Sequence, residues 1–280
     1  MKKILPLSVI FLFALFLFST TAFALSLGSL ESLGNQITIY DQKSNGSANY
    51  GMSEDQEVEP GMVWNQKWDL EGFFKNGNTL SMVGGFNFKT GGYDSHRGQF
   101  WGSGDIFFDV DGTPQYGTDI PNGNLPVTNT YGYDYAIRLN FSNDSGTFDH
   151  SGTFDLYQAG NNATTISSYF TQNYSSNPYQ IDQGWSKIAG DPGDRNFEFR
   201  TNVADDSTYL NGIFEGGSHY IVQLALPTEL KGFNYVHFAE QCGNDSLMGA
   251  NPVPEPGTML LLGTGLIGLA GFGRKKFMKK

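Results

Sequence analysis

Two uncharged apolar runs, one near each end of the chain, restrict the folded domain to the residues between them. The first spans residues 4–18 and follows Lys2 and Lys3, and the second spans residues 258–273. The body between them, residues 25–252, is long enough for one domain with a sizeable hydrophobic core. Any fold has to be built from this body, because segments of the terminal kind serve targeting rather than packing.

The first run predicts a secretory signal peptide over residues 1–24. Lys2 and Lys3 supply its positive start, and Ala22 and Ala24 are small residues suited to cleavage. The body is therefore expected to fold outside the cytoplasm. Its only cysteine, Cys242, cannot form an intrachain disulfide there. Cys242 is either a small buried hydrophobic residue or a thiol that pairs with another chain or is modified.

Residues 253–280 combine a stiff spacer, the second apolar run and a group of cations. The run at residues 258–273 is shorter than the ~20 residues of a typical membrane-spanning helix, but long cationic side chains can reach the interface. We expect a short C-terminal transmembrane helix whose end lies in the cytoplasm. The spacer and the cations are Val253, Pro254, Glu255, Pro256, Arg274, Lys275, Lys276, Lys279 and Lys280.

This order of Pro-Glu-Pro, apolar run and cations resembles the PEP-CTERM sorting signal, which exosortase enzymes of Gram-negative bacteria recognise. The resemblance implies export, a transient stay in the inner membrane and processing near residues 253–256. It places the mature protein at the cell surface or in the extracellular matrix of a biofilm. The implied partners are an exosortase and exopolysaccharide.

A second, looser resemblance concerns the Cys-Gly-Asn-Asp segment that begins at Cys242. Such a segment recurs just before the sorting signal in some PEP-CTERM ectodomains. Together with residues 104–112 and a predicted strand that ends at Phe141, it implies a shared architecture and no particular activity.

The charge of the body argues against nucleic acid as a partner. The chain has 17 basic and 28 acidic residues. Seven of the basic residues and one acidic residue lie in the terminal segments, which leaves a body with a formal charge of −17. Such a surface repels polyanions and attracts cations.

Short alternating segments predict an all-β fold, either an antiparallel β-sandwich or a jelly roll. Residues 133–141 and 219–226 alternate apolar and polar side chains, as half-buried strands do. We expect the domain to span residues 25–242, with residues 243–252 as a linker to the anchor. Further short strands are predicted at residues 36–40, 85–89, 152–157, 196–201 and 233–238.

Residues 104–112 contain the strongest candidate for a metal site. If they form a strand, Asp105, Asp109 and Asp111 share one face and run into a glycine turn. Ca²⁺ accepts several oxygen ligands in flexible geometry, and Asp119 and Asp134 are possible additions. An EF-hand loop does not fit, because Phe107 and Thr118 would stand where carboxylates are required. The alternative is a solvated acidic face that ends in a turn.

Aromatic residues offer a second candidate, a sugar-stacking surface. Flat rings and amide groups suit glycans, although packing in the core is the competing interpretation for each indole. The residues concerned are Trp64, Trp68, Trp101 and Trp185.

Nothing in the sequence identifies a catalytic site. The four histidines are scattered without metal-ligand spacing, and neither a nucleophile elbow nor a phosphate-binding loop is present. A pair of carboxylates of the glycosidase type cannot be singled out in so acidic a chain. We therefore expect a binding or structural protein rather than an enzyme, with a secreted glycan-active hydrolase as the alternative.

Overall fold

The computed structural model describes residues 32–39, 66–112, 123–142, 150–169, 177–190, 195–214 and 217–251. Its strands form one large sheet and two small ones, and every strand pair is antiparallel. The prediction of an all-β antiparallel fold is confirmed. The predicted signal peptide, Trp64, Asp119 and residues 253–280 lie outside the described residues.

In the ranges that the structure describes, sixteen short strands and two 3₁₀ turns make up the regular structure. They are β1 (Asn35–Gln36), η1 (Gln66–Trp68), β2 (Leu70–Asn76), β3 (Thr79–Gly84), β4 (Gly92–Asp94), β5 (Gln99–Trp101), β6 (Ile106–Asp109), β7 (Pro126–Thr128), β8 (Tyr135–Phe141), β9 (His150–Ala159), β10 (Thr164–Ile166), β11 (Gln180–Ile181), β12 (Trp185–Lys187), β13 (Asn196–Val203), β14 (His219–Ala225), η4 (Thr228–Leu230), β15 (Tyr235–Ala239) and β16 (Ser246–Ala250).

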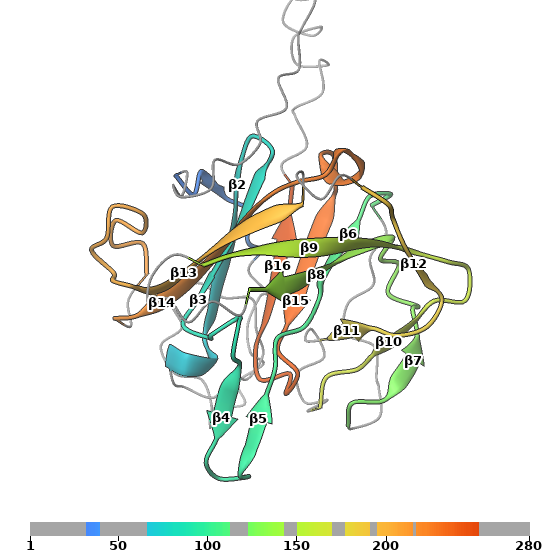
Figure 1. The fold of residues 1–280 in the computed structure, drawn as a ribbon, viewed down its shortest axis with the longest axis horizontal. Helices are drawn as coiled ribbons and strands as arrows, with labels where there is room; N and C mark the ends of the chain where they lie inside the picture. The colour runs from blue at the N-terminus through green and yellow to red at the C-terminus, as the bar shows by residue number, and fades with distance from the viewer. Residues whose placement is uncertain are drawn as a thin grey trace, which may run out of the picture.

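The large sheet curls until its two ends meet. Its strand order is β1-β2-β3-β14-β13-β9-β8-β6-β15-β16, and β12 joins β9. The Ile39 amide donates to the Met248 carbonyl at 2.7 Å, and the Ala250 amide donates to the Ile37 carbonyl at 2.9 Å, so β16 is bonded to the segment that follows β1. Figure 1 shows β9 running across the direction of β2 and β16. One curled sheet thus stands in place of the two sheets of a sandwich.

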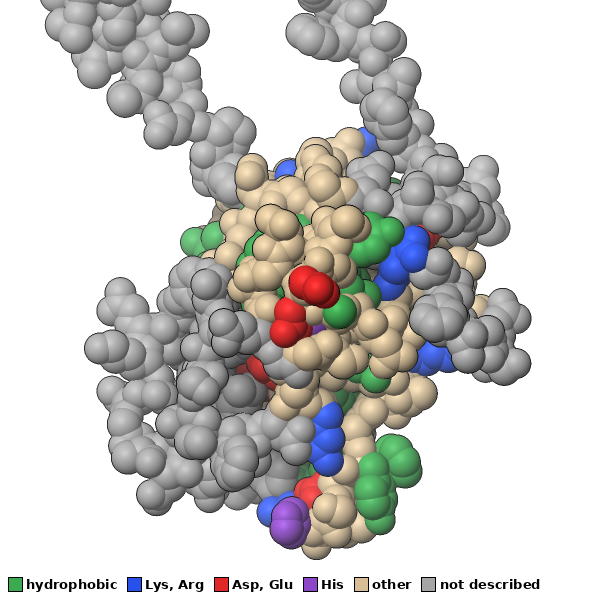
Figure 2. Space-filling view, turned by 90° about the vertical axis from the view of Figure 1, so that its left-hand side faces the viewer, with side chains coloured by type: hydrophobic (Ala, Val, Ile, Leu, Met, Phe, Trp, Pro, Cys, Tyr) green, Lys and Arg blue, Asp and Glu red, His purple; other side chains and the backbone are tan. Residues whose placement is uncertain are grey.

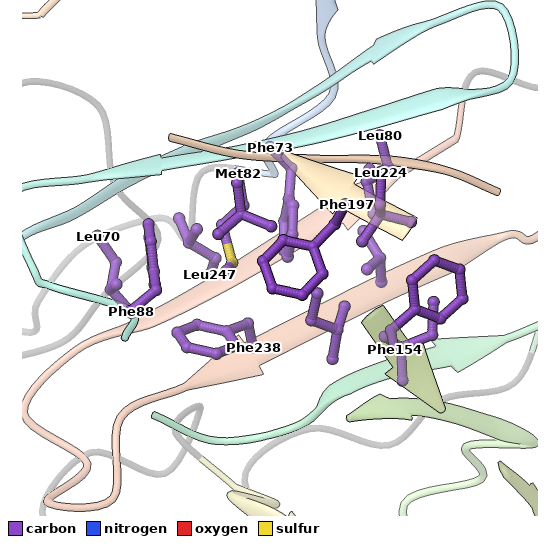
Figure 3. Packing of buried hydrophobic residues seen from close by; sticks show 14 of the residues in the cluster. Leu70, Phe73, Leu80, Met82, Phe88, Phe154, Phe197, Leu224, Phe238 and Leu247 are labelled. Atoms are coloured by element: carbon purple, nitrogen blue, oxygen red, sulfur yellow. The ribbon is translucent and has the colours of Figure 1, made fainter. Parts of the chain in front are cut away.

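The main hydrophobic core lies inside this curl. Phe73, Phe154, Phe197, Phe238 and Leu247 come from five different strands and point toward one another (Figure 3). All of them are buried, and each such side chain contributes roughly 1.5–3 kcal/mol by leaving water. The fold is therefore held by packing, because Cys242, the only cysteine, is a buried free thiol.

Alternation along the strands is confirmed for β8 and β14, although each strand also buries part of its other face. The apolar face of β8, with Ile137 and Leu139, packs on the main core, and Ala136 on its other face is buried in a separate cluster. β14 packs on the main core with Val222 and Leu224, and its other face is also buried. Ile221 packs there in a second cluster that includes residues of the segment after β13.

Residues 243–252 are not the linker predicted from the sequence. Ser246–Ala250 forms β16, which pairs with β15 and contributes Leu247 to the core. The glycine and asparagine of residues 243–244 belong to the turn between these two strands. The local composition of a tight turn resembles that of a flexible linker, and only the pairing partner distinguishes them.

The strand predicted at residues 85–89 is a turn instead. The Asn87 side-chain oxygen accepts hydrogen bonds from the Lys89 amide at 3.0 Å and the Thr90 amide at 3.1 Å. An asparagine that bonds nearby backbone amides competes with strand pairing. This turn leads into the separate β4–β5 hairpin, which projects from the lower end of the molecule in Figure 1.

Candidate functional site

Three carboxylates converge at the end of β6. One oxygen each of Asp109, Asp111 and Asp134 lies within 4.8 Å of the others. Asp109 is buried, Asp134 is partly buried and Asp111 is exposed. Asp134 reaches the group because β8 pairs with β6, and its amide donates to the Phe108 carbonyl at 2.9 Å.

Backbone amides hold two of these carboxylates in place. The Gly112 amide donates to Asp109 Oδ1 at 2.7 Å, and the Val110 amide donates to Asp134 Oδ2 at 2.8 Å. Gly112 has a φ of +93°, which favours glycine at this turn. Burial, and then the nearby Asp111, raise the pKa of the Asp134 carboxyl. A set of carboxylate oxygens suits a hard cation such as Ca²⁺.

Asp105 does not join this group, contrary to the sequence-based expectation. Its two oxygens accept hydrogen bonds from Arg138 at 2.9 and 2.7 Å, and Oδ2 also accepts from the Ile181 amide at 2.9 Å. The ion pair between Asp105 and Arg138 lies where β11, a strand of a small sheet, meets β6 and β8. Asp134, named only as an additional ligand from the sequence, takes the third place beside Asp109 and Asp111.

A buried histidine between two carboxylates is the most pronounced acid–base arrangement in the described part of the chain. His219 Nδ1 lies 2.6 Å from Glu71 Oε2, and His219 Nε2 lies 2.7 Å from Asp205 Oδ1. Gln66 donates to Glu71 Oε1 at 2.8 Å. The side chains of Glu71 and His219 are fully buried, whereas that of Asp205 reaches the surface.

The surroundings perturb the pKa values of this trio. Burial raises the pKa of the Glu71 carboxyl to about 7, against the opposing effect of His219. The two carboxylates raise the pKa of His219 even though burial opposes its charge. The hydrogen bond from His219 lowers the pKa of Asp205. Sequence reasoning missed the trio because residues 71, 205 and 219 meet only through strand pairing and a loop.

The Cys-Gly-Asn-Asp segment forms the turn between β15 and β16. Asp245 accepts from the Leu70 amide of β2 at 2.6 Å and from the Ser246 amide at 2.6 Å. Gly243 has a φ of +72°, and the Cys242 thiol donates to Glu240 Oε2 at 3.0 Å. The segment thus ties the last strands of the sheet to β2, and the thiol of Cys242 is buried rather than available at the surface.

Two of the three described tryptophans belong to the core. Trp68 and Trp101 are buried, and Trp185 is partly buried with its indole N–H donating to the Thr164 carbonyl at 2.8 Å. Core packing is therefore the correct interpretation for Trp68 and Trp101. Among the described residues, the most exposed aromatic side chains are those of Tyr93 and Phe100, which the sequence did not distinguish from the other aromatics.

Comparison with known proteins identifies the end of the chain. The PEP-CTERM protein-sorting motif matches residues 252–275, which include Val253, Pro254, Glu255 and Pro256, as well as Arg274 and Lys275. No curated protein and no solved structure matches the chain. Among the described residues, no helix is long and apolar enough to cross a membrane. The chain therefore carries a PEP-CTERM sorting motif at residues 252–275, which implies export to the cell surface through an exosortase.

Proposed function

We propose that this protein has a binding or structural role at the cell surface or in the exopolysaccharide matrix of a Gram-negative bacterium. The observation that carries the proposal is the sorting motif at residues 252–275. Before processing, the apolar run at residues 258–273 holds the chain in the inner membrane. Cleavage near residues 253–256 then releases the acidic body to the outside.

The placement of the acid–base groups supports a role without catalysis. A general acid has to reach the bond that it protonates. Glu71 and His219 are fully buried and bonded to each other, so neither side chain faces solvent. Asp105 is likewise bonded to Arg138. These groups stabilise or tune the fold rather than present themselves to a substrate.

A glycan-active hydrolase remains the competing proposal, and one observation favours it. A pKa of about 7, as for Glu71, suits a general acid at neutral pH. The burial of Glu71 argues against this role.

The deciding experiment screens the full-length chain on a glycan array and in hydrolysis assays with the same glycans. Our proposal predicts retention on one or more glycans with no products released. Catalytic turnover that Glu71→Gln abolishes would establish the hydrolase instead.

We also propose Ca²⁺ as a structural ion between Asp109, Asp111 and Asp134. A chelator is expected to lower the melting temperature of the full-length chain, and added Ca²⁺ is expected to restore it.

Asp111→Asn tests the site most cleanly, because the Asp111 side chain is exposed, whereas the Asp109 side chain accepts a hydrogen bond from the Gly112 amide. This variant should melt at one temperature with or without Ca²⁺. Asp206→Asn, at another exposed aspartate, should keep the full response. An identical melting curve of the wild type with chelator and with Ca²⁺ counts against the site.

A further inference from the structure

A loop at residues 204–214 covers part of the outer face of the large sheet. It places Leu210 and Phe214, both fully buried, in the second cluster with Phe74 of β2 and Ile221 of β14. The Phe74 and Phe214 rings meet edge to face, with centroids 5.8 Å apart. In Figure 1 this loop is the orange segment at the left, and Figure 2 shows that side of the molecule, with carboxylates near its middle. Opening of the loop would expose an apolar surface to water.

A histidine–carboxylate contact ties the start of this loop to the sheet. Asp205 Oδ1 lies 2.7 Å from Nε2 of His219, the first residue of β14, and accepts a hydrogen bond from the Gly217 amide at 2.8 Å. The other ring nitrogen of His219, Nδ1, lies 2.6 Å from Glu71 Oε2. The His219 ring also lies beside Phe214, with centroids 6.3 Å apart. His219 therefore links the loop to Glu71 of β2.

The number of N–H donors decides whether both contacts of His219 can persist. A protonated imidazole has two N–H groups and can donate to both carboxylates, whereas a neutral imidazole has only one. When Glu71 holds the proton instead, its O–H donates to Nδ1, and the N–H at Nε2 donates to Asp205. Both contacts thus need one proton on the Glu71–His219 pair. Once that proton is lost, two carboxylates compete for one N–H.

The contact with Asp205 is the one that we expect to break. Glu71 is fully buried, and although Gln66 also donates to it at 2.8 Å, loss of the histidine donor would leave a buried charge poorly compensated. The Asp205 side chain is 38% exposed, so water can replace the histidine there. Loss of the proton therefore releases the loop rather than Glu71.

Neighbouring charged groups act on both sides of this contact. Burial, and to a smaller extent the like charge of Asp69, raise the pKa of the Glu71 carboxyl. On β13, the Arg200 guanidinium lies 5.4 Å from the centroid of the Tyr209 ring, so a cation–π contact also holds the loop. Arginine stays protonated at any pH at which the protein folds. The pH dependence of the loop should therefore come from Glu71 and His219.

We propose that His219 is a pH-sensitive switch that holds the loop at residues 204–214 closed. The loop stays closed while the Glu71–His219 pair carries a proton, and it opens more often as pH rises and that proton is lost. Opening uncovers the second cluster on the outer face of the sheet. The inference goes beyond the binding or structural role proposed above and does not rest on it, because it concerns a movement within the domain.

Hydrogen exchange of the full-length chain, in detergent, tests the switch by mass spectrometry at about pH 6 and about pH 8.5. After correction for the intrinsic pH dependence of exchange, peptides from residues 204–214 should exchange about tenfold faster at the higher pH, as expected for loss of one charge-assisted hydrogen bond. Peptides from β6 and β8 should keep their protection. Equal corrected rates of the wild-type loop at both pH values would overturn the proposal.

Two variants should change the loop in opposite directions. Asp205→Ala removes the acceptor, so its loop should exchange fast at both pH values. Glu71→Gln supplies an amide that donates to Nδ1 without an extra proton, so its loop should stay protected at both. The matched control, Asp206→Ala at an exposed neighbour, should respond as the wild type does.

A Glu71→Gln loop that opens with pH as the wild type does would also overturn the switch. So would an Asp205→Ala loop that remains protected at the lower pH. Asp205 reaches the surface, so its variant keeps the test decisive even where Glu71→Gln does not fold.

Discussion

Buried ionisable side chains are the main feature of this protein at the scale of single residues. His219 lies between Glu71 and Asp205, and Asp105 is bonded to Arg138. Burial costs a charged group much of its hydration, so such groups persist only when partners or protons compensate. Both arrangements therefore make stability sensitive to pH or to loss of a partner.

We expect stability to fall as pH rises, in part through Glu71 and His219. The Glu71 carboxyl has a pKa of about 7 in the folded protein against an ordinary 4.5, and that of His219 is also raised. The folded state therefore binds more protons than the unfolded state. The contribution of Glu71 to the free energy of unfolding is full below about pH 4.5 and is lost as pH rises through about 7.

Urea unfolding at about pH 5, 6, 7 and 8 measures this effect. Burial raises the pKa of Asp105, Glu240 and Asp245 too, so the comparison between variants is more informative than the wild-type slope alone. Glu71→Gln should flatten the fall in the free energy of unfolding, while the exposed control Asp206→Asn should not. Parallel curves for wild type and Glu71→Gln would contradict the prediction.

Removal of the Arg138 guanidinium should destabilise the fold. Arg138→Met leaves the Asp105 carboxyl buried without its charged partner, which typically costs about 3–5 kcal/mol. We expect the lower end, about 3 kcal/mol, because the Arg138 side chain is 34% exposed. Chemical denaturation measures the loss, and the double variant Asp105→Asn with Arg138→Met should recover part of it. Equal loss in the single and double variants would show that the buried carboxylate is not its cause.

At the scale of elements, the strands after residue 234 decide whether the sheet closes. β15 pairs with β6, and β16 adds the last edge, which bonds to the segment after β1. The turn between β15 and β16 is tied to β2 by Asp245. This hairpin is therefore part of the domain and not a tether to the membrane.

Truncation distinguishes a strand from a linker at residues 246–250. A chain that ends at Asn251 should fold and melt cooperatively, because it keeps β16 and the core residue Leu247. A chain that ends at Gly243 should lose the cooperative transition, since its core and sheet edge are both open. Circular dichroism and thermal melting compare the two. A folded, equally stable shorter chain would restore the linker interpretation.

At the scale of the whole molecule, an acidic β domain is joined to a sorting motif at residues 252–275. β16 ends at Ala250, so the motif begins almost directly after the last strand. Little chain separates the folded body from the proposed cleavage region. Access by an exosortase therefore depends on residues 251–256 rather than on a long spacer.

The intact mass of the surface-exposed protein tests processing. Cleavage near residues 253–256 predicts a mass that lacks the segment through Lys280, and also lacks residues 1–24. The double variant Pro254→Ala with Pro256→Ala should keep its tail and remain in the membrane fraction. A surface form of the wild type that still contains Lys280 would reject cleavage.

Periodic strands and the sorting motif were predictable because their signals are local. Alternation in residues 133–141 identified β8 to within two residues of its start, since one face of the strand packs on the core. The metal candidate was half predictable: Asp109 and Asp111 are neighbours in sequence and stay together. Asp134 takes the place that was expected for Asp105, because the pairing of β6 with β8 brings Asp134 close to Asp109. Asp105 is instead bound by Arg138.

The sequence by itself determined that this protein carries a sorting motif for export and that its body is built from antiparallel strands. Both follow from short patterns that act within a few residues. Only the tertiary structure decided that one sheet curls to meet itself and that residues 246–250 complete it. It also buried His219 between carboxylates while leaving Tyr93 and Phe100 in water. These outcomes depend on which distant strands pair, and pairing is settled by the energy of the assembled core rather than by any local pattern.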